Sequence, residues 1–543
     1  MCTELFTHYL SGFVLLPLLA AVVMALLPFP ANDKRYHAWG IGASALLFLY
    51  SLWGWFNPQV VDANPLTVPW LPSLGIQFAL GADGISLTLV VLTTFLLLLS
   101  AIASITTITH RLKLYYSMLF VMAASVLGVF LARDLFLFFL AYEVELIPMY
   151  LLIAIWGGPR RQYAATKFVL YTLFGSVFMV AAILGIYFAA QQAGLPLDGL
   201  YLFSNLKPFL PTLALSTQTL MFLGLFVAFA IKLPVVPFHT WLPDAHVEAP
   251  TPVSMLLAGI LLKMGGYGML RLCWDFFPHA ATSLGPWIAL LAVTNILYAA
   301  RVALVQTDLK KLIAYSSVSH MGFVLLGLAS LNAIGLNGAM FVMFAHGLVS
   351  AASFMCVGTV YNRSHTRVIA DMGGLAIPMP TIFYFFLFMS MASLGLPLLI
   401  SFASESLVFY GAYTSQAFDV TVRLLGLSIP WNMQIVTFFS AIGVVIGAAY
   451  LLWMLKRVFY GPTPQQWQGL PDASRSEVLV LATLAILVVA YGVFPQQIMK
   501  AFEADVTAIA NQFTQTAATA TNVPTPGVAT PKPALRLSTL PQP

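Results

Sequence analysis

The sequence predicts an all-α membrane protein with about fourteen transmembrane helices. Of its 543 residues, 60% are hydrophobic and only 8% are charged, and the mean hydropathy is +0.90. An average soluble domain carries about 25% charged residues, so a soluble fold of this composition could not cover its surface with polar groups. Apolar runs of about 20 residues, enough to cross a hydrocarbon core of about 30 Å, recur along most of the chain.

Fourteen apolar runs are long enough to be spans. They lie at 5–27, 37–56, 84–108, 114–132, 135–156, 166–189, 219–238, 253–272, 286–304, 311–330, 335–360, 382–410, 436–458 and 477–495. The first run lacks a basic start and a clear cleavage site, which favours a retained helix over a signal peptide. Residues 515–543 are rich in Thr, Ala and Pro, a composition that predicts a disordered tail.

The basic residues give the chain an orientation. With an even number of spans both termini lie on one side, here called side A, and the opposite side is side B. Of the 24 Lys and Arg residues, fifteen fall in side B loops, seven fall on side A, and Lys232 and Lys263 fall inside spans. Because cytoplasmic loops are enriched in Lys and Arg, side B is expected to be cytoplasmic and side A periplasmic or lumenal.

No motif in the sequence indicates a bound cofactor or metal. Cys2, Cys273 and Cys356 are far apart and match no spacing for zinc, haem, an iron–sulfur cluster or a disulfide framework. The glycine-rich "KMGGYG" at 263–268 lies within an apolar helix pattern, where glycines allow close helix packing. Any electron transfer linked to this chain is therefore expected to occur on other subunits.

Six ionisable residues within the spans are the candidate functional groups: Glu143, Lys232, Lys263, His320, His346 and Glu405. A charge at the bilayer centre costs about 2.5–3.5 kcal/mol on insertion scales, so such residues face protein or water and often mark ion pathways. At 1.5 Å per residue, Glu143 lies about 13 Å and Lys232 about 20 Å into their spans. Titratable groups at one depth on different helices would suit lateral proton transfer.

Structural explanations compete with the functional one. Glu143, Lys232 and Lys263 could form a purely structural ion-pair network, and His346 could equally be a hydrogen-bonded core residue. Glu145 lies about 200° around the helix from Glu143, which suggests a packing or subunit-contact residue. Glu143 and Lys232 are the pair expected to respond to proton movement. Burial lowers the pKa of a lysine, whereas a nearby carboxylate raises it, so the protonation of Lys232 can be adjusted.

Prolines predict two helix breaks. Pro234 and Pro237 follow Lys232, and Pro397 precedes Glu405. Proline removes a backbone donor, and broken backbone at membrane depth is tolerated only inside protein or beside a wet cavity. Spans 4–8 and 9–13 each have such a break in their fourth helix, an arrangement typical of inverted repeats around a transport site.

Long motifs resemble the antiporter-like proton-pumping subunits of complex I, most closely the chain 4 type of the cyanobacterial and plastid branch. They are "AYEVELIPMYLLIAIWGG", "YAATKFVLYT", "KLPVVPFHTWLPDAHVEAPTPVSMLLAGILLKMGGYG" and "TDLKKLIAYSSVSHMGFVLLG". The resemblance covers about residues 5–495. It implies helices 1–3 at 1–113, five-helix repeats at 114–272 and 286–460 with helices 7 and 12 broken, helix 14 at 477–495 and the tail at 515–543.

Within this resemblance, the family's helix 5 glutamate corresponds to Glu143, its two lysines to Lys232 and Lys263, and its helix 10 histidine to His320. The helix 12 group is a glutamate in the chain 4 type, which matches Glu405. One departure is "LPLLISFASE", where Leu398 and Ile400 replace the usual glycines. It leaves the backbone of that break in doubt and suggests a specialised paralogue such as a carbon-dioxide-uptake form.

The resemblance implies a proton-translocating subunit of an NAD(P)H- or ferredoxin-dependent plastoquinone oxidoreductase. Plastoquinone and iron–sulfur clusters are then expected on partner subunits, with sister antiporter-like subunits, protons and the lipid bilayer as partners and no nucleic acid. The expected location is a cyanobacterial thylakoid membrane with lumenal termini. The alternatives are a subunit of a multi-subunit sodium/proton antiporter, which shares this fold and these charges, and a scaffold without transport activity.

Overall fold

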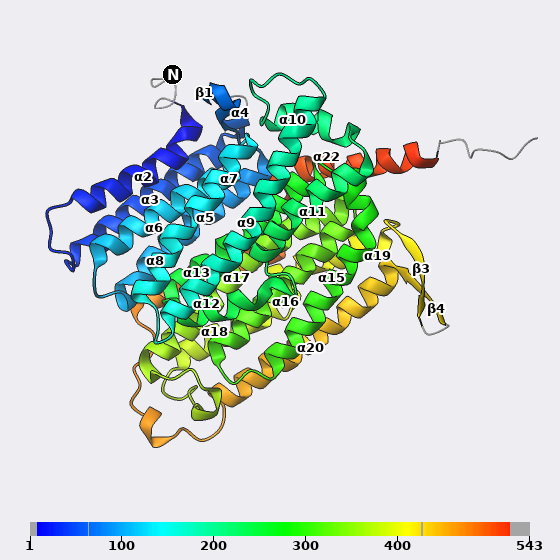
Figure 1. Ribbon diagram of the computed structural model, residues 1–543. Helices are drawn as coiled ribbons and strands as arrows, with labels where there is room; N and C mark the ends of the chain where they lie inside the picture. Colours follow the sequence, from blue (N-terminus) through cyan, green and yellow to red (C-terminus); the bar gives the residue numbers. More distant parts are fainter. Residues whose placement is uncertain (1–7, 63–64, 425–426, 522–543) are drawn as a thin grey trace, which may run out of the picture.

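The computed structural model describes residues 8–62, 65–424 and 427–521. Its long helices lie side by side in one tilted bundle (Figure 1). Within these ranges, thirteen helices are long and apolar enough to cross a membrane. They are α2 (Tyr9–Leu26), α3 (Arg35–Phe56), α5 (Gly84–Thr107), α6 (Leu112–Leu131), α7 with α8 (Leu135–Val144, Leu146–Trp156), α9 (Arg161–Gln192), α11 (Leu215–Lys232), α13 to η5 (Thr251–Trp274), α15 (Pro278–Leu304), α16 (Leu309–Ala329), α17 (Ala333–Ser364), α20 (Met433–Phe459) and α21 (Arg475–Val493).

The remaining predicted span, the twelfth at 382–410, is present as two half-helices, α18 (Pro380–Ser393) and α19 (Ile400–Thr414), each too short to cross alone. The predicted all-α, fourteen-span fold is therefore confirmed. The predicted first span began at residue 5, and its residues 5–7 lie outside the described ranges, as does Cys2.

The first break follows Lys232, where α11 ends, and the chain resumes in the short helix α12 (Trp241–Glu248). Neighbouring side chains form hydrogen bonds with the backbone groups that the break leaves without helical partners. The Asn295 amide oxygen accepts from the Val236 N–H at 2.8 Å, and the Trp241 indole donates to the Ile231 carbonyl at 2.8 Å. The first break is thus satisfied inside the protein, as membrane depth requires.

The second break differs because it lies at the outer face of the chain. Leu396 and Leu398 have 49% and 67% of their surface exposed, whereas Leu233 in the first break is fully buried. Leu398 adopts a left-handed conformation with φ of 73°, as does Gly395. Leucine is unfavourable in this region because its Cβ crowds the following carbonyl. The departure from glycine at this position therefore strains the backbone without removing the break.

Three helices form the centre of the bundle. The most apolar stretches of α13 to η5 and of α17 are fully buried inside the protein, and that of α16 is 89% buried. By contrast, α2, α3, α20 and α21 are about one-third buried and form the outer faces. The central position of these helices matters because they carry Lys263, His320 and His346.

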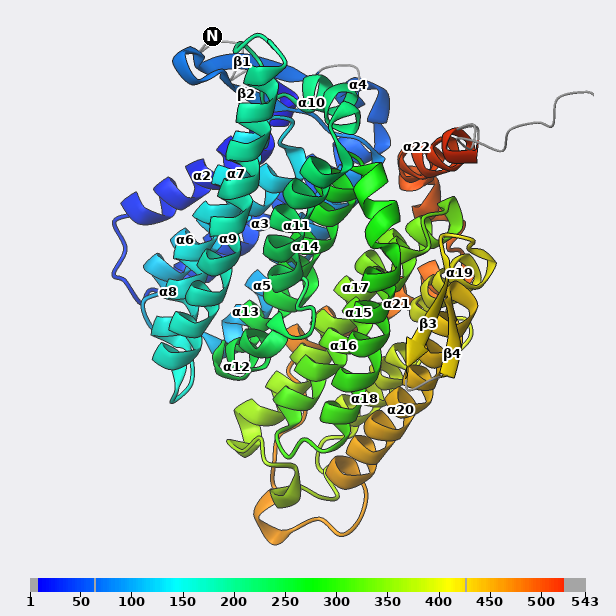
Figure 2. The ribbon, with the colours of Figure 1, turned by 45° about the vertical axis from the view of Figure 1, so that its right-hand side comes forward.

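Several elements outside the spans were not predicted. Two hairpins pair β1 (Leu66–Leu71) with β2 (Ile76–Leu80) and β3 (Asp419–Leu424) with β4 (Leu427–Asn432). The short helices are α4 (Pro58–Asp62) and α10 (Phe203–Phe209). In Figures 1 and 2, the β1–β2 hairpin and α10 lie at the end of the bundle where the N-terminus lies.

The helix α22 (Gln496–Thr521) follows the last predicted span and reaches into the range predicted as a tail. It lies at the side A end of the bundle (Figure 2), where the Asp505 carboxylate accepts from the Gly84 N–H at 2.7 Å. Thr507 meets Asn337 of α17 at 3.3 Å. Its apolar residues Phe502 and Val506 are fully buried, so the helix is fixed by amphipathic packing. The helix continues to Thr521, within the range predicted as a tail from residue 515, and 522–543 lie outside the described residues.

Replacing Leu398 with Gly should remove the strain of its positive φ. The matched control is Leu396→Gly, an exposed leucine of the same linker whose φ is not positive. We expect the Leu398→Gly variant to be more stable than the control by about 1 kcal/mol. Thermal unfolding of the purified complex in detergent measures the difference. Equal stability of the two variants would show that Leu398 is unstrained.

Candidate functional site

Lys232 forms a fully buried ion pair at the first break. Its ammonium group contacts the Glu145 carboxylate, and both side chains have 0% of their surface exposed. The rings of Tyr142 and Phe168 lie 5.1 and 5.3 Å from the ammonium nitrogen. A buried charge is tolerated only when it is paired, so Glu145 compensates Lys232.

The expected direct pair of Glu143 with Lys232 is therefore wrong. Glu143 instead accepts a hydrogen bond from the Ser176 hydroxyl of α9. The prediction assumed a continuous helix, whereas the structure has a break at Glu145, between α7 and α8. Pro148 explains the break, because it lacks the N–H that would bond to the Val144 carbonyl and fits only in the first turn of a new helix. Glu145 is thereby directed at Lys232.

Lys263 lies at the centre of the bundle between two π-helical segments, η4 (Leu257–Leu261) and η5 (Met269–Trp274). Its ammonium group donates to the Ala258 carbonyl at 2.6 Å and meets Nδ1 of His346 at 2.8 Å. Such π-helical turns frequently occur at functional sites. Gly265 allows this helix to approach the first break, since a Cβ there would lie 2.7 Å from the Leu233 nitrogen. The predicted packing role of this glycine is confirmed.

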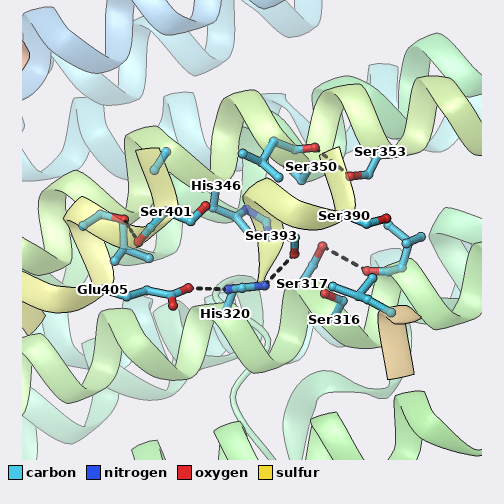
Figure 3. A pocket seen from close by; sticks show the side chains of 16 residues that line it. Ser316, Ser317, His320, His346, Ser350, Ser353, Ser390, Ser393, Ser401 and Glu405 are labelled. Atoms are coloured by element: carbon cyan, nitrogen blue, oxygen red, sulfur yellow. Dashed lines mark hydrogen bonds and ion pairs between the residues drawn. The ribbon is translucent and has the colours of Figure 1, made fainter. Parts of the chain in front are cut away.

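His320 and Glu405 meet beside the second break (Figure 3). Nδ1 of His320 lies 3.1 Å from the Glu405 carboxylate, and its Nε2 lies 3.0 Å from the Ser393 hydroxyl. The His320 and His346 rings are 5.7 Å apart. Four of the predicted residues therefore form one row in the order Lys263, His346, His320, Glu405. His346 is a member of this row and is hydrogen-bonded within the core.

Eight serine side chains line the cavity that contains His320, His346 and Glu405. They come from α16, α17, α18 and α19, and we call the space they line the serine cavity: Ser316, Ser317, Ser350, Ser353, Ser390, Ser393, Ser401 and Ser404. The sequence did not predict this cavity, because the helix break and the packing of α17 bring the serines to one place.

His246 is another buried group that sequence reasoning missed. It lies on α12, and its ring stacks on Phe354 with a centroid distance of 4.2 Å. Neither ring nitrogen has a hydrogen-bond partner among the described residues. His246 is close enough to Lys263 and Lys310 to interact with both electrostatically. Its sequence signal was its place one short helix after the break, in "WLPDAH".

This arrangement can carry protons through a membrane interior. Each neighbouring pair in the Lys263–Glu405 row except His346–His320 is within hydrogen-bond distance, and the groups are a carboxylate, two imidazoles and an amine. No side-chain hydrogen bond in the described part of the chain joins Lys232 to Lys263. The site therefore has two clusters, one at each helix break.

Comparison with known proteins places the chain in a family. Residues 132–429 match the family model described as "NADH:quinone oxidoreductase/Mrp antiporter, TM". A curated relative from Gloeobacter violaceus, named NAD(P)H-quinone oxidoreductase chain 4, is 41% identical over 90% of both chains. A chain of the respiratory complex I from Thermus thermophilus is 28% identical with a TM-score of 0.81, over 93% of this chain and 99% of that one.

A chain of an Mrp complex from Dietzia sp. is 22% identical with a TM-score of 0.75, and the match covers 94% of this chain and 56% of that one. At this identity the likeness shows the fold alone.

Replacing Glu145 with Gln should destabilise the protein by about 3–5 kcal/mol, because it leaves the Lys232 charge buried and unpaired. The double variant Glu145→Gln, Lys232→Met should recover much of the loss, since no charge then remains. Glu143→Gln is the matched control and should have a much smaller effect. Thermal unfolding of the complex in detergent reports all three. A larger loss for Glu143→Gln than for Glu145→Gln would contradict the observed pairing.

Proposed function

The chain belongs to the family of NADH:quinone oxidoreductase and Mrp antiporter transmembrane subunits, and from this premise we propose that it translocates protons as the chain 4 subunit of an NAD(P)H-quinone oxidoreductase. The observation that carries the proposal is the buried row of Lys263, His346, His320 and Glu405. A subunit that only supported its neighbours would gain nothing from a row of titratable groups in its core. Quinone reduction then takes place on partner subunits and drives the proton movement.

In this proposal the two clusters exchange protons across the bundle. Glu143 and the Glu145–Lys232 pair form the first cluster, and a proton that reaches Glu145 weakens its attraction for Lys232. His246 lies beside the gap between the clusters, and its free ring nitrogens offer an acceptor and a donor. The second cluster then passes the proton from Lys263 through the two histidines to Glu405.

The direction of transport follows from the basic residues. Side B is the cytoplasmic side, and both ends of the chain face the lumen or periplasm. Glu405 lies beyond the second break in a segment that runs from side B to side A, so we assign it to release toward side A. Moving one charge across the membrane costs about 2.3 kcal/mol per 100 mV, which the redox reaction must supply.

The setting of the complex follows from the relatives. Their cyanobacterial sources support a thylakoid location and plastoquinone as the electron acceptor on partner subunits. Iron–sulfur clusters are assigned to those partners as well, and sister antiporter-like subunits to the same membrane arm. The strained Leu398 is compatible with a specialised paralogue such as a carbon-dioxide-uptake form.

A sodium/proton antiporter subunit is the second candidate function, favoured by the shared fold of the Dietzia chain. The higher identity and full-length match to chain 4 relatives favour the oxidoreductase. Co-purification separates the two. Redox subunits and quinone should accompany this chain, whereas small antiporter subunits in their place would support the second candidate.

Replacing Lys263 with Met should interrupt proton transfer between the two clusters, because Met matches its length but cannot hold a proton. The proton yield per quinone reduced should fall severalfold, while the amount of subunit in the complex stays unchanged. The matched control is Lys500→Met on the exposed surface of α22. Pumping is followed with a pH-sensitive dye in sealed vesicles. An unchanged yield would remove Lys263 from the pathway.

Replacing Glu405 with Gln should block release toward side A. Gln keeps the size of the side chain and a hydrogen bond to His320 but cannot lose a proton at neutral pH. Outward proton release after a single turnover should be delayed or lost, measured with an impermeant pH dye on side A. The control is Glu503→Gln, an exposed glutamate of α22. Release at the wild-type rate would exclude Glu405 as the exit group.

A further inference from the structure

The serine cavity extends from His320 toward side B. On α16, Ser316 lies one turn nearer the Leu309 end than His320, a difference of about 6 Å. On α17, Ser353 lies about 10 Å nearer the Ser364 end than His346. These two helix ends lie on the same membrane side, because the Leu309 N–H donates to the Arg367 carbonyl at 2.9 Å.

Two hydroxyl groups in the cavity are unsatisfied. Ser350 and Ser390 are buried, and their oxygens have no hydrogen-bond partner among the described residues. Leaving a buried hydroxyl unpaired costs about 1–3 kcal/mol. A bound water that also contacts the neighbouring serines would satisfy both groups. The lining therefore favours a hydrated cavity.

Ordinary helix packing explains the serines less well. Small residues often let membrane helices approach closely, and their hydroxyls then bond to a carbonyl of their own helix. Ser353 does so, donating to the Val349 carbonyl at 2.8 Å. Ser350 and Ser390 do not, and they lie in the same cavity as His320 (Figure 3). Ser440 is also buried and unpartnered but lies outside the cavity, so convergence on His320 is the distinguishing feature.

The cavity contacts His320 at both ring nitrogens and includes Glu405 in its lining. Ser393 meets Nε2 of the ring, while Glu405 meets Nδ1. At the far end, the Tyr450 hydroxyl donates to Ser316 at 2.7 Å. The apolar side chains of Ile313 and Leu451 also line the cavity. On α16, Ile313 is nearer side B than Ser316, so it lies where an apolar constriction could close the cavity when water leaves.

We propose that the serine cavity is a second, water-filled inlet that delivers protons from side B to Nε2 of His320. This inference rests on the proposed proton-translocating function and adds an entry point within the second half of the chain. A proton accepted at Nε2 makes the imidazole cationic, and the Nδ1 proton then passes to Glu405. Cavity water then takes up the Nε2 proton and returns one to Nδ1, which restores the starting tautomer, so no net change remains on His320.

The test compares two double variants that have nearly the same shape. Ser350→Val with Ser390→Val removes both hydroxyls, whereas Ser350→Thr with Ser390→Thr adds the same bulk and keeps them. Both are assayed in the assembled complex for protons pumped per quinone reduced. We expect the Val pair to lose pumping severalfold relative to the Thr pair. Ser440→Val, which removes an unpartnered hydroxyl outside the cavity, should pump normally.

Three further variants separate failure of the inlet from failure of the proposed function. Glu143→Gln, in the first cluster, tests the proposed function itself. If it impairs pumping while the Val and Thr pairs pump equally, the inlet is wrong and the function stands. If Glu143→Gln and the Val pair both pump at wild-type rates, the inlet and the function are both wrong. If the Val pair fails to assemble, the single variants Ser390→Val and Ser390→Thr give the same comparison, with equal pumping again excluding the inlet.

Discussion

A charged side chain at membrane depth is stable only if the protein supplies a partner for it, and this constraint organises the structure. Lys232 is held by Glu145, and Lys263 by a backbone carbonyl and His346. Glu145 and His346 lie on other helices than the lysines they contact, so these contacts also determine which helices must be adjacent. The most buried helices, α13 to η5, α16 and α17, carry Lys263, His320 and His346, while the apolar α2, α3, α20 and α21 form the outer faces.

The interrupted helices follow from the same constraint. A continuous helix satisfies its own backbone and leaves few polar groups free for a proton path. The breaks after Lys232 and before Glu405, together with the π-helical turns around Lys263, release carbonyls and redirect side chains. Ala258 illustrates this, since its carbonyl binds Lys263. Both clusters lie where regular helix geometry is interrupted.

The fold and most of the site could be predicted from the sequence because each rests on a local signal. Apolar runs predicted the membrane spans, and prolines predicted the helix breaks. Ionisable residues within the runs predicted the candidate proton-transfer groups. Glu145 was misassigned because its direction depends on a helix break that Pro148 imposes three residues later. The extent of α22 was missed because its amphipathic residues are anchored by distant groups such as Gly84. The serine cavity depends on four helices, which no local pattern specifies.

The central claim is that the two clusters form one continuous proton path. The most direct test is the position of ordered water in a high-resolution cryo-electron microscopy map of the assembled complex. Our account predicts water within hydrogen-bond distance of His246, linking the Glu145–Lys232 pair to Lys263 in at least one catalytic state. A gap between Lys232 and Lys263 that is filled with apolar side chains and stays dry in every state would contradict it.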